Sequence, residues 1–417
     1  MRSGREFDWP LLLTALLLCT IGLAMIYSVY QPLGDGGGSE PDYFYFKRQA
    51  IWVGVGILAM IFGFAMPFRV FETLAYVVYV GCVILLVAVL AMPNEGAGTQ
   101  RWFRLGPIAI QPSELAKIAV LFVWARVMAG HRRAPSQPRN LMMVLALCLV
   151  PFLLILRQPD LGTSLVFFGM LMPMLYWRGF KGIHILFVFS PLVSAVLIIY
   201  GENVAHNPWP FGVFIVLIMA VAYLRRRRHL FESVSLVIAN LGVGLILPVI
   251  WNDLKGYQQR RILNFLDPGA DKLGAGWQVI QSKIAIGSGG FDGKGYLAGT
   301  QKALEFLPAK HTDFIFSVLG EELGFVGAVV VLSLYAVIVY KALAIAQKAK
   351  SQFASTVCVG IAAYFFFQVV VNVAMTTGMA PVTGIPLPFM SYGGSSMLVS
   401  CFLIGFLLNC STRWYEY

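Results

Sequence analysis

Apolar runs of about 20 residues recur along the whole chain and constrain its fold more than any other feature. A run of that length, folded as an α-helix, crosses the hydrocarbon core of a bilayer. The chain is 58% hydrophobic and 12% charged, and no soluble domain of useful size fits between the runs. The sequence therefore predicts an all-helical, polytopic integral membrane protein, with residues 1–417 forming a single transmembrane domain.

The pattern predicts about twelve membrane spans, with boundaries good to a few residues. They cover residues 9–30, 48–66, 72–92, 113–130, 141–156, 161–177, 183–200, 209–224, 230–251, 312–341, 354–376 and 393–411. The first run follows Arg2 and Arg5 and lacks a small-residue cleavage site. We therefore expect a retained helix at this end rather than a signal peptide.

Basic residues in alternate connections predict the topology. They are Arg69, His131, Arg132, Arg133, Arg139, Arg178, Lys181, Arg225 to Arg228, Lys341, Lys348, Lys350 and Arg413. All of them lie on one side if the N-terminus lies there too, and the positive-inside rule makes that side cytoplasmic. We therefore expect both termini in the cytoplasm and the long connection 252–311 outside it. The net charge of +11 follows from this arrangement and does not indicate nucleic-acid binding.

Cysteine and histidine usage excludes two kinds of site. The six cysteines all lie in or at the ends of apolar segments, so neither disulfides nor a cysteine-based metal site is expected. The five histidines do not have the spacing of zinc ligands. No protein metal site is predicted from these residues.

The long connection 252–311 is rich in Gly, Asp, Lys and Gln, and long structured loops on rigid scaffolds tend to carry function. Its basic residues break the positive-inside pattern; they are Lys255, Arg260, Arg261, Lys272, Lys283, Lys294, Lys302 and Lys310. An anionic ligand at the membrane surface, such as a phosphate or pyrophosphate head group, would explain them. A solvated face beside anionic lipid is the alternative.

Further polar residues are expected on the same face. Glu114 and Lys117 open the fourth span at positions i and i+3, where they can pair as ligand contacts or as a structural ion pair. Trp102 precedes them and could anchor the chain at the membrane interface. Arg157 and Asp160 bracket a proline in a polar turn, which could be closed by its own ion pair.

The span after the long connection opens with charged residues. We expect Thr312, which follows His311, to cap this helix, with Asp313 favoured by the helix dipole. Glu321 and Glu322 follow about 12 Å deeper at 1.5 Å per residue, where two carboxylates need partners or water.

The segment PVTGIPLPFMSYGGSS near the C-terminus cannot form a regular helix, because Pro381, Pro386 and Pro388 interrupt it. Irregular backbone at membrane depth must line a cavity inside the protein. Together with the preceding residues it predicts a polar chamber that opens to the outer face. A transporter and an enzyme acting on a lipid-borne substrate would both fit; the one-sided clustering and the lack of an internal repeat favour the enzyme.

Several long motifs resemble one known family. The stretches LDPGADKLGAGWQVIQSKIAIGSGG, GKGYLAGTQ and LEFLPAKHTDFIFSVLGEELGFVG are similar to those of the SEDS family of cell-wall polymerases (FtsW/RodA/SpoVE). SKIAIGSGG and GTQ are nearer to its RodA branch than to its FtsW branch. RWFRLGPIAIQPSELAK, QPDLGTS and PLPFMSYGGSS extend the resemblance over nearly the whole chain.

The resemblance implies a peptidoglycan glycosyltransferase that joins lipid II units into glycan strands during cell elongation and rod-shape maintenance, with undecaprenyl pyrophosphate leaving. In this family the acidic residue before the LGxGY/WQ segment is catalytic, which here is Asp271, the expected general base. Lys117, Arg157 and Lys283 are the candidates for stabilising the negative charge of the departing pyrophosphate. A divalent cation (Mg2+ or Mn2+) could bridge Asp271 and the pyrophosphate; no other cofactor is expected.

The resemblance also predicts substrate contacts and partners. The candidate substrate-binding residues are Arg101, Trp102, Glu114, Lys117, Arg157, Asp160, Gln278, Ser282, Lys283, His311, Asp313 and Ser391. A class B penicillin-binding protein should supply the transpeptidase that this sequence lacks, beside other membrane proteins of the elongation complex. The expected location is the bacterial inner membrane. A lipid II flippase and a non-catalytic scaffold of the elongation complex remain alternatives.

The chain departs from the family pattern in three places. Lys272 stands where the family has Pro, and its charge could help to keep Asp271 ionised. Ala309 stands where the family commonly has Glu, which excludes a carboxylate role there. The family typically has ten spans, so the helical pair predicted over 183–228 would be an addition.

Overall fold

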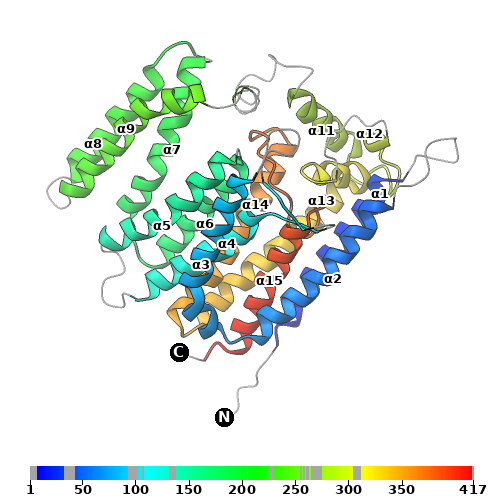
Figure 1. Cartoon of the computed structure of the whole chain (residues 1–417). Helices are drawn as coiled ribbons and strands as arrows, with labels where there is room; N and C mark the ends of the chain where they lie inside the picture. The colour runs from blue at the N-terminus through cyan, green and yellow to red at the C-terminus, as the bar shows by residue number, and fades with distance from the viewer. Residues whose placement is uncertain are drawn as a thin grey trace. The chain divides into compact units, whose positions relative to one another are not determined.

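The computed structural model describes residues 7–31, 43–92, 101–105, 108–130, 138–158, 160–203, 205–225, 230–253, 256, 259, 263, 275–303 and 311–415 (Figure 1). Its helices are α1 (Trp9–Val29), α2 (Phe44–Ala65), α3 (Phe68–Ala91), α4 (Pro112–Gly130), α5 (Pro138–Arg157), α6 (Leu161–Trp177), α7 (Gly182–Asn203), α8 (Trp209–Arg225), α9 (Leu230–Asp253), α11 (Ala275–Gly289), α12 (Thr300–Ala303), α13 (Ile315–Lys348), α14 (Gln352–Thr376) and α15 (Gly394–Thr412). Two short strands, β1 (Phe103–Leu105) and β2 (Ile108–Ile110), pair in antiparallel fashion.

The prediction of an all-helical, polytopic membrane protein is confirmed. Within the described ranges, twelve helices of 17 residues or more cover the twelve predicted spans. Eight of them are long and apolar enough to cross a membrane, and three more, α6, α8 and α9, contain shorter apolar stretches over residues 161–177, 209–224 and 233–249. The remaining one is α4, whose apolar sequence is interrupted by Glu114, Lys117 and Arg126.

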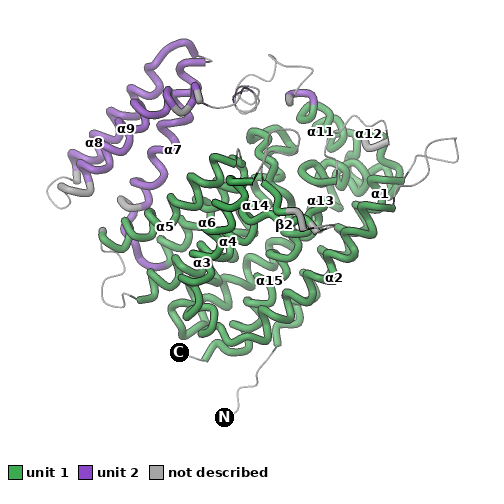
Figure 2. Tube along the Cα trace, viewed as in Figure 1, with its two compact units in different colours: residues 1–177, 278–417 green, residues 178–277 purple. Residues whose placement is uncertain are grey.

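The chain forms two compact units (Figure 2). Unit 1 comprises residues 1–177 and 278–417, and unit 2 comprises residues 178–277. In unit 2, α7, α8 and α9 pack on one another, and the buried Asn240 of α9 bonds both Ser190 and Ser194 of α7, at 2.8 and 2.7 Å. The predicted additional pair, 183–228, falls on α7 and α8. Its status as an addition, like the single-domain organisation, stays a prediction.

Unit 1 is held together by closely packed helix pairs, of which α2 with α15, α13 with α14 and α3 with α4 are the most extensive. Small residues allow the close approach of α2 and α15. A Cβ at Gly405 would lie only 2.0 Å from the backbone oxygen of Met60. In a membrane, where lipid is as apolar as leucine, such close backbone contact is a main source of helix association.

Side-chain contacts define the two ends of unit 1. At one end, Asp8 before α1 pairs with Lys341 of α13 at 3.0 Å, and Arg413 after α15 donates to the carbonyl of Ala65 at the end of α2, at 3.3 Å. Both ends of the described chain therefore lie at the same end of unit 1. The candidate site residues lie at the opposite end, where α1 finishes and α4 begins.

Three local predictions need correction. The connection 252–311 is not irregular throughout, because it contains the 15-residue helix α11 and the short α12. The connection 93–112 contains the β1–β2 hairpin, which the sequence analysis missed. Thr312 does not cap α13, which begins at Ile315 after Phe314, so His311 to Phe314 form a turn ahead of the helix.

Candidate functional site

Glu114 and Lys117 form the predicted ion pair in the first turns of α4. The Lys117 Nζ lies 2.7 Å from the Glu114 Oε1, and both side chains are almost fully buried, at 2% and 4% exposure. The same ammonium lies 5.3 Å from the centre of the Tyr364 ring of α14, a favourable cation–π geometry. The pair is sealed inside the bundle, so Lys117 cannot reach a phosphate in this conformation without leaving Glu114.

Asp160 stands at the start of α6 and acts as its cap. Its carboxylate accepts from the Thr163 amide at 3.1 Å and from the Thr163 hydroxyl at 2.9 Å, which is N-cap geometry. It also accepts from the side-chain amide (Nε2) of Gln111 at 3.0 Å, which connects α6 to the residue before α4. Within the described residues no ion pair joins Asp160 to Arg157, so the salt-bridged turn, one of the alternatives left open, is wrong, and the side chain of Arg157 is exposed.

Gln158 connects three segments that are distant in sequence. Its carbonyl accepts from the Arg101 Nε at 3.0 Å, and its side-chain amide donates to the carbonyl of Leu86 in α3 at 3.2 Å. Trp102, beside Arg101, is 43% exposed. The fold thus brings Arg101, Gln158 and Asp160 to the end of unit 1 where α3 finishes and α4 begins, and leaves the ring of Trp102 accessible.

His311 lies in a cluster of tyrosines at the end of α1. The Tyr30 hydroxyl lies 2.9 Å from the His311 Nδ1, and the Tyr45 ring lies 4.8 Å from the His311 ring. The backbone of His311 accepts from the Tyr392 amide at 2.8 Å. This places His311 against α1, α2 and the irregular segment before α15.

The segment predicted to be irregular is non-helical from residue 381 to 393, after which α15 begins, and residues 387–391 within it are buried. Ser391 ties it down: its hydroxyl donates to the Thr312 carbonyl at 2.6 Å and accepts from the Leu387 amide at 2.8 Å. Asn372 of α14 donates to the carbonyls of Asp313 (3.0 Å) and Ile385 (2.8 Å). Ser391 is therefore a structural tie in this conformation.

Helix α11 is fixed by one buried serine. The Ser282 hydroxyl bonds the Thr376 carbonyl of α14 at 2.5 Å and the Ser317 hydroxyl of α13 at 2.6 Å. Gln278, one turn earlier on the same face, is half-buried. Lys283 is exposed, and its stem crosses Gly378, where a Cβ would lie 2.2 Å from the lysine Cε.

A polar stripe on α14 faces the interior of unit 1. Tyr364, Gln368, Asn372 and Thr376 recur every four residues and are fully buried. Among buried side chains, both polar atoms of Gln368 and one oxygen of Asn372 and of Glu114 have no protein hydrogen-bond partner. Such groups are costly and tend to mark functional sites. The sequence analysis missed this stripe, although its i, i+4 repeat in an apolar helix was visible.

Asp271, the predicted catalytic residue, lies outside the described residues, as do Lys272 and Ala309. The described chain resumes at Ala275, four residues after Asp271, at the start of α11. The predicted catalytic role is therefore untested by the geometry, while the helix that follows it has a fixed place in the fold.

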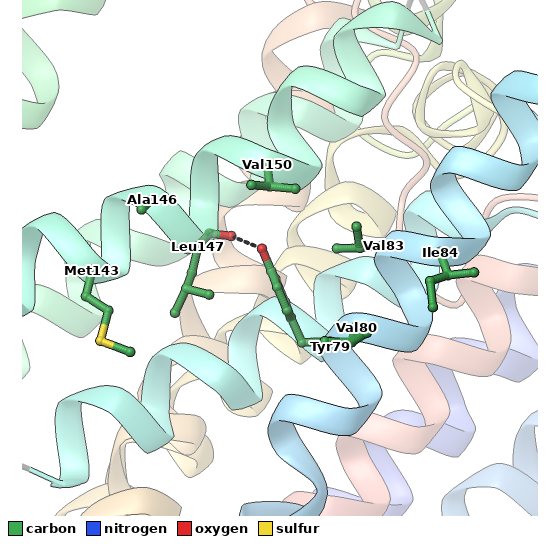
Figure 3. Close-up of a pocket in the computed structure, with 8 residues that line it drawn as sticks. All are labelled: Tyr79, Val80, Val83, Ile84, Met143, Ala146, Leu147 and Val150. Atoms are coloured by element: carbon green, nitrogen blue, oxygen red, sulfur yellow. Dashed lines mark hydrogen bonds between the residues drawn. The ribbon is translucent and has the colours of Figure 1, made fainter.

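An apolar hollow of about 390 Å³ lies between α3 and α5 (Figure 3). Its lining consists of Tyr79, Val80, Val83, Ile84, Met143, Ala146, Leu147 and Val150. The one polar group in Figure 3 that reaches it, the Tyr79 hydroxyl, donates to the Leu147 carbonyl at 2.9 Å. The hollow has no free polar group, so it suits hydrocarbon rather than a sugar or phosphate.

Known proteins are similar to this chain along its length. The family described as "Cell cycle protein" (FtsW/RodA/SpoVE) matches residues 8–210 and 211–416. Peptidoglycan glycosyltransferase MrdB of Escherichia coli K12 is 37% identical over 386 residues, covering 92% of this chain and 90% of the relative. Peptidoglycan glycosyltransferase RodA of Treponema pallidum is 33% identical over 437 residues, covering 99% of each.

Solved structures agree. A chain from a peptidoglycan synthase complex, studied for the coordination of polymerization and crosslinking, superposes with a TM-score of 0.69 at 30% identity, covering 99% of both chains. Rod shape determining protein RodA of Thermus thermophilus superposes with a TM-score of 0.62 at 25% identity, again over 99% of both. With matches of this extent in sequence and in fold, the chain belongs to the FtsW/RodA/SpoVE family of cell cycle proteins.

Proposed function

We propose that this protein is a peptidoglycan glycosyltransferase that joins lipid II units into glycan strands during cell elongation. Relatives whose names state peptidoglycan glycosyltransferase activity align with 92% and 99% of the chain. The observation that carries the proposal is the gathering of polar residues at one end of unit 1. Residues from Arg101 to Ser391 meet there, as an enzyme acting at one membrane face requires.

The reaction needs a base for the acceptor hydroxyl and positive charge for the departing pyrophosphate. Asp271 is the proposed base, and α11 begins four residues after it. Lys283 is a better candidate for the pyrophosphate than Lys117, because it is exposed whereas Lys117 is buried on Glu114. Arg157, which is also exposed, is the second candidate.

A divalent cation bridging the pyrophosphate and Asp271 stays a proposal. Carboxylate and phosphate oxygens are the ligands that Mg2+ and Mn2+ prefer. Across the described residues, no group of three or more His, Cys, Asp or Glu side chains could hold a metal ion by itself. The substrate pyrophosphate would therefore have to supply most of the ligands.

The apolar hollow between α3 and α5 is the proposed seat of the lipid tail. Its residues on α3 end at Ile84, two residues before Leu86, whose carbonyl accepts from Gln158 of the polar site. A polyprenyl chain lying there would bring its pyrophosphate toward Arg101 and Arg157. The apolar lining provides no group that would compete for the head group.

The topology and partners follow from the same proposal. Both described chain ends lie at the end of unit 1 opposite the polar site, which supports cytoplasmic termini and an extracytoplasmic site under the positive-inside rule. A class B penicillin-binding protein is the proposed transpeptidase partner, together with other membrane proteins of the elongation complex. A solved relative occurs in a peptidoglycan synthase complex, which supports such a partnership.

The test uses purified full-length protein, its transpeptidase partner and labelled lipid II. The proposal expects glycan polymer from the wild type and none from Asp271→Ala. Lipid II scrambling in liposomes without polymer would favour a flippase instead. Polymer at the wild-type rate from Asp271→Ala would exclude Asp271 as the base.

A further inference from the structure

The chain after α11 is docked into a break in α13. At Gly324 the backbone leaves the helical region, with φ 61° and ψ −160°. Residues 290–301, which we call the docked segment, pair with the backbone on both sides of this break. The bonds are Lys294 N to Glu321 O (3.0 Å), Gly295 N to Glu322 O (3.0 Å), Phe325 N to Gly290 O (3.0 Å) and Val326 N to Phe291 O (3.2 Å).

Two glycines make this docking possible. A Cβ at Gly293 would lie 2.2 Å from the carbonyl oxygen of Glu322, and a Cβ at Gly324 would lie 2.3 Å from the amide nitrogen of Gly293. Both glycines also have positive φ, at 82° and 61°, which side chains disfavour. The two backbones therefore touch directly, and no other residue type fits at either position.

One buried carboxylate binds two separate parts of the docked segment, at Lys294 and at Thr300 to Gln301. Glu321 is fully buried, and among the described residues the hydrogen-bond donors to its carboxylate come from that segment. They are Lys294 Nζ (2.7 Å), Thr300 N (2.9 Å), Thr300 Oγ1 (2.9 Å) and Gln301 N (3.2 Å). Lys294 also donates to the Thr300 hydroxyl at 2.7 Å, which closes the arrangement.

Glu322 fastens the same place to α1. Its two carboxylate oxygens accept from the Ser28 hydroxyl at 2.6 and 2.7 Å. Burial, with the Glu322 charge close by, raises the pKa of the Tyr296 phenol, which donates to the Ala24 carbonyl at 2.8 Å. The next residue, Leu297, has φ 73°, a strained conformation that persists only where the surroundings hold it.

We propose that Glu321 is a positioning residue of the transferase: it fixes the docked segment and, through it, both flanking parts of the active site. This inference rests on the proposed function. Through α11, the segment leads back to Ala275, four residues after Asp271, and its other end, at Gln301, lies ten residues before His311. A purely structural anchor would lower stability alone, whereas a positioning residue lowers turnover in protein that remains folded.

The experiment measures lipid II polymerisation by the full chain with its partner, well below the unfolding temperature. Lys294→Met and Glu321→Gln should each lower kcat about tenfold or more with little change in KM, because the competent arrangement becomes a minor state. Lys341→Met is the matched control. Its ion pair with Asp8 lies at the opposite end of unit 1, and Lys341 and Lys294 are both 27% exposed. The control should keep kcat unchanged.

A crosslink supplies the rescue. Phe291 and Phe325 are 67% and 60% exposed and stack at 5.9 Å across the docked contact. In a Lys294→Met background, cysteines at these two positions joined by a short thiol crosslinker should restore turnover. Unchanged kcat in both Lys294→Met and Glu321→Gln, an equal fall in the Lys341→Met control, or no recovery on crosslinking would overturn the inference. Absence of polymer from the wild type would instead overturn the proposed function, and the inference with it.

Discussion

Removal of Lys117 alone should be among the most destabilising single changes in unit 1. Its ammonium and the Glu114 carboxylate are 2.7 Å apart, with 2% and 4% of the side chains exposed. Lys117→Met would leave a buried carboxylate whose second oxygen already lacks a protein partner. Breaking a buried pair from one side typically costs about 3–5 kcal/mol. Loss of the contact with the Tyr364 ring adds a contribution of about 0.5–2 kcal/mol.

The double replacement separates the cost of leaving one charge unpaired from the cost of burying the two side chains. In Glu114→Gln with Lys117→Met no charge remains to be buried, so, apart from the lost contact with the Tyr364 ring, the free energy of unfolding should fall by no more than about 1 kcal/mol, since such exchanges are often neutral. The double-mutant cycle should then give a coupling of at least about 2 kcal/mol. Lys341→Met, whose pair with Asp8 is more exposed, should cost only about 0–1 kcal/mol.

The assay is reversible unfolding in mixed detergent micelles, followed by circular dichroism, for the wild type, both single variants, the double variant and Lys341→Met. A cost below about 1 kcal/mol for Lys117→Met would refute the reasoning, because that value is typical of an exposed pair. So would a double variant whose cost equals the sum of the two single costs, since that would mean no coupling.

Three further predictions concern packing, capping and the lipid tail. Gly405→Ala should lower the free energy of unfolding by about 1–3 kcal/mol or more, because its Cβ would press on the Met60 carbonyl, whereas Gly54→Ala, with no atom nearby, should be neutral or stabilising in the same unfolding assay. Asp160→Ala should cost about 1 kcal/mol through loss of the α6 cap, with an amide at this position costing less. Ala146→Trp should fill the α3–α5 hollow and raise KM for lipid II while sparing a short-tailed analogue; equal effects on both substrates would argue against a tail site there.

The helical framework was predictable because its signal is local. A run of apolar residues long enough to cross a bilayer leaves the backbone few alternatives to a helix. The Glu114–Lys117 pair was predictable for the same reason, since i and i+3 share a face in any helix. The prolines of the segment 377–393 likewise excluded a helix without reference to any other part of the chain.

The contacts that build the site were not predictable, because they join residues that are distant in sequence. An ion pair of Asp160 with its neighbour Arg157 was one alternative from the sequence, yet Asp160 binds Thr163 and Gln111 instead. A capping role requires only the helix that follows, so the sequence allowed both outcomes. Thr312 failed as a cap because α13 begins only at Ile315, with Phe314 at its N-cap; the Thr312 carbonyl, in the turn before the helix, accepts from the Ser391 hydroxyl. Nothing near Thr312 in the sequence indicates that contact.

Motif residues of this family therefore have two different roles: some hold the fold together, and others are exposed where a substrate can bind. The sequence suggests ligand contacts at Ser282, Ser391 and Asp160. In the structure their polar atoms form hydrogen bonds to other parts of the fold. The side chains of Lys283 and Trp102 are exposed, so both can contact a substrate. Loss of activity on substitution cannot separate the two groups, since a displaced scaffold also stops catalysis. The separation has to come from kinetics: a scaffold residue that also positions the site should change kcat as well as stability, and a contact residue should change KM in a protein of unaltered stability.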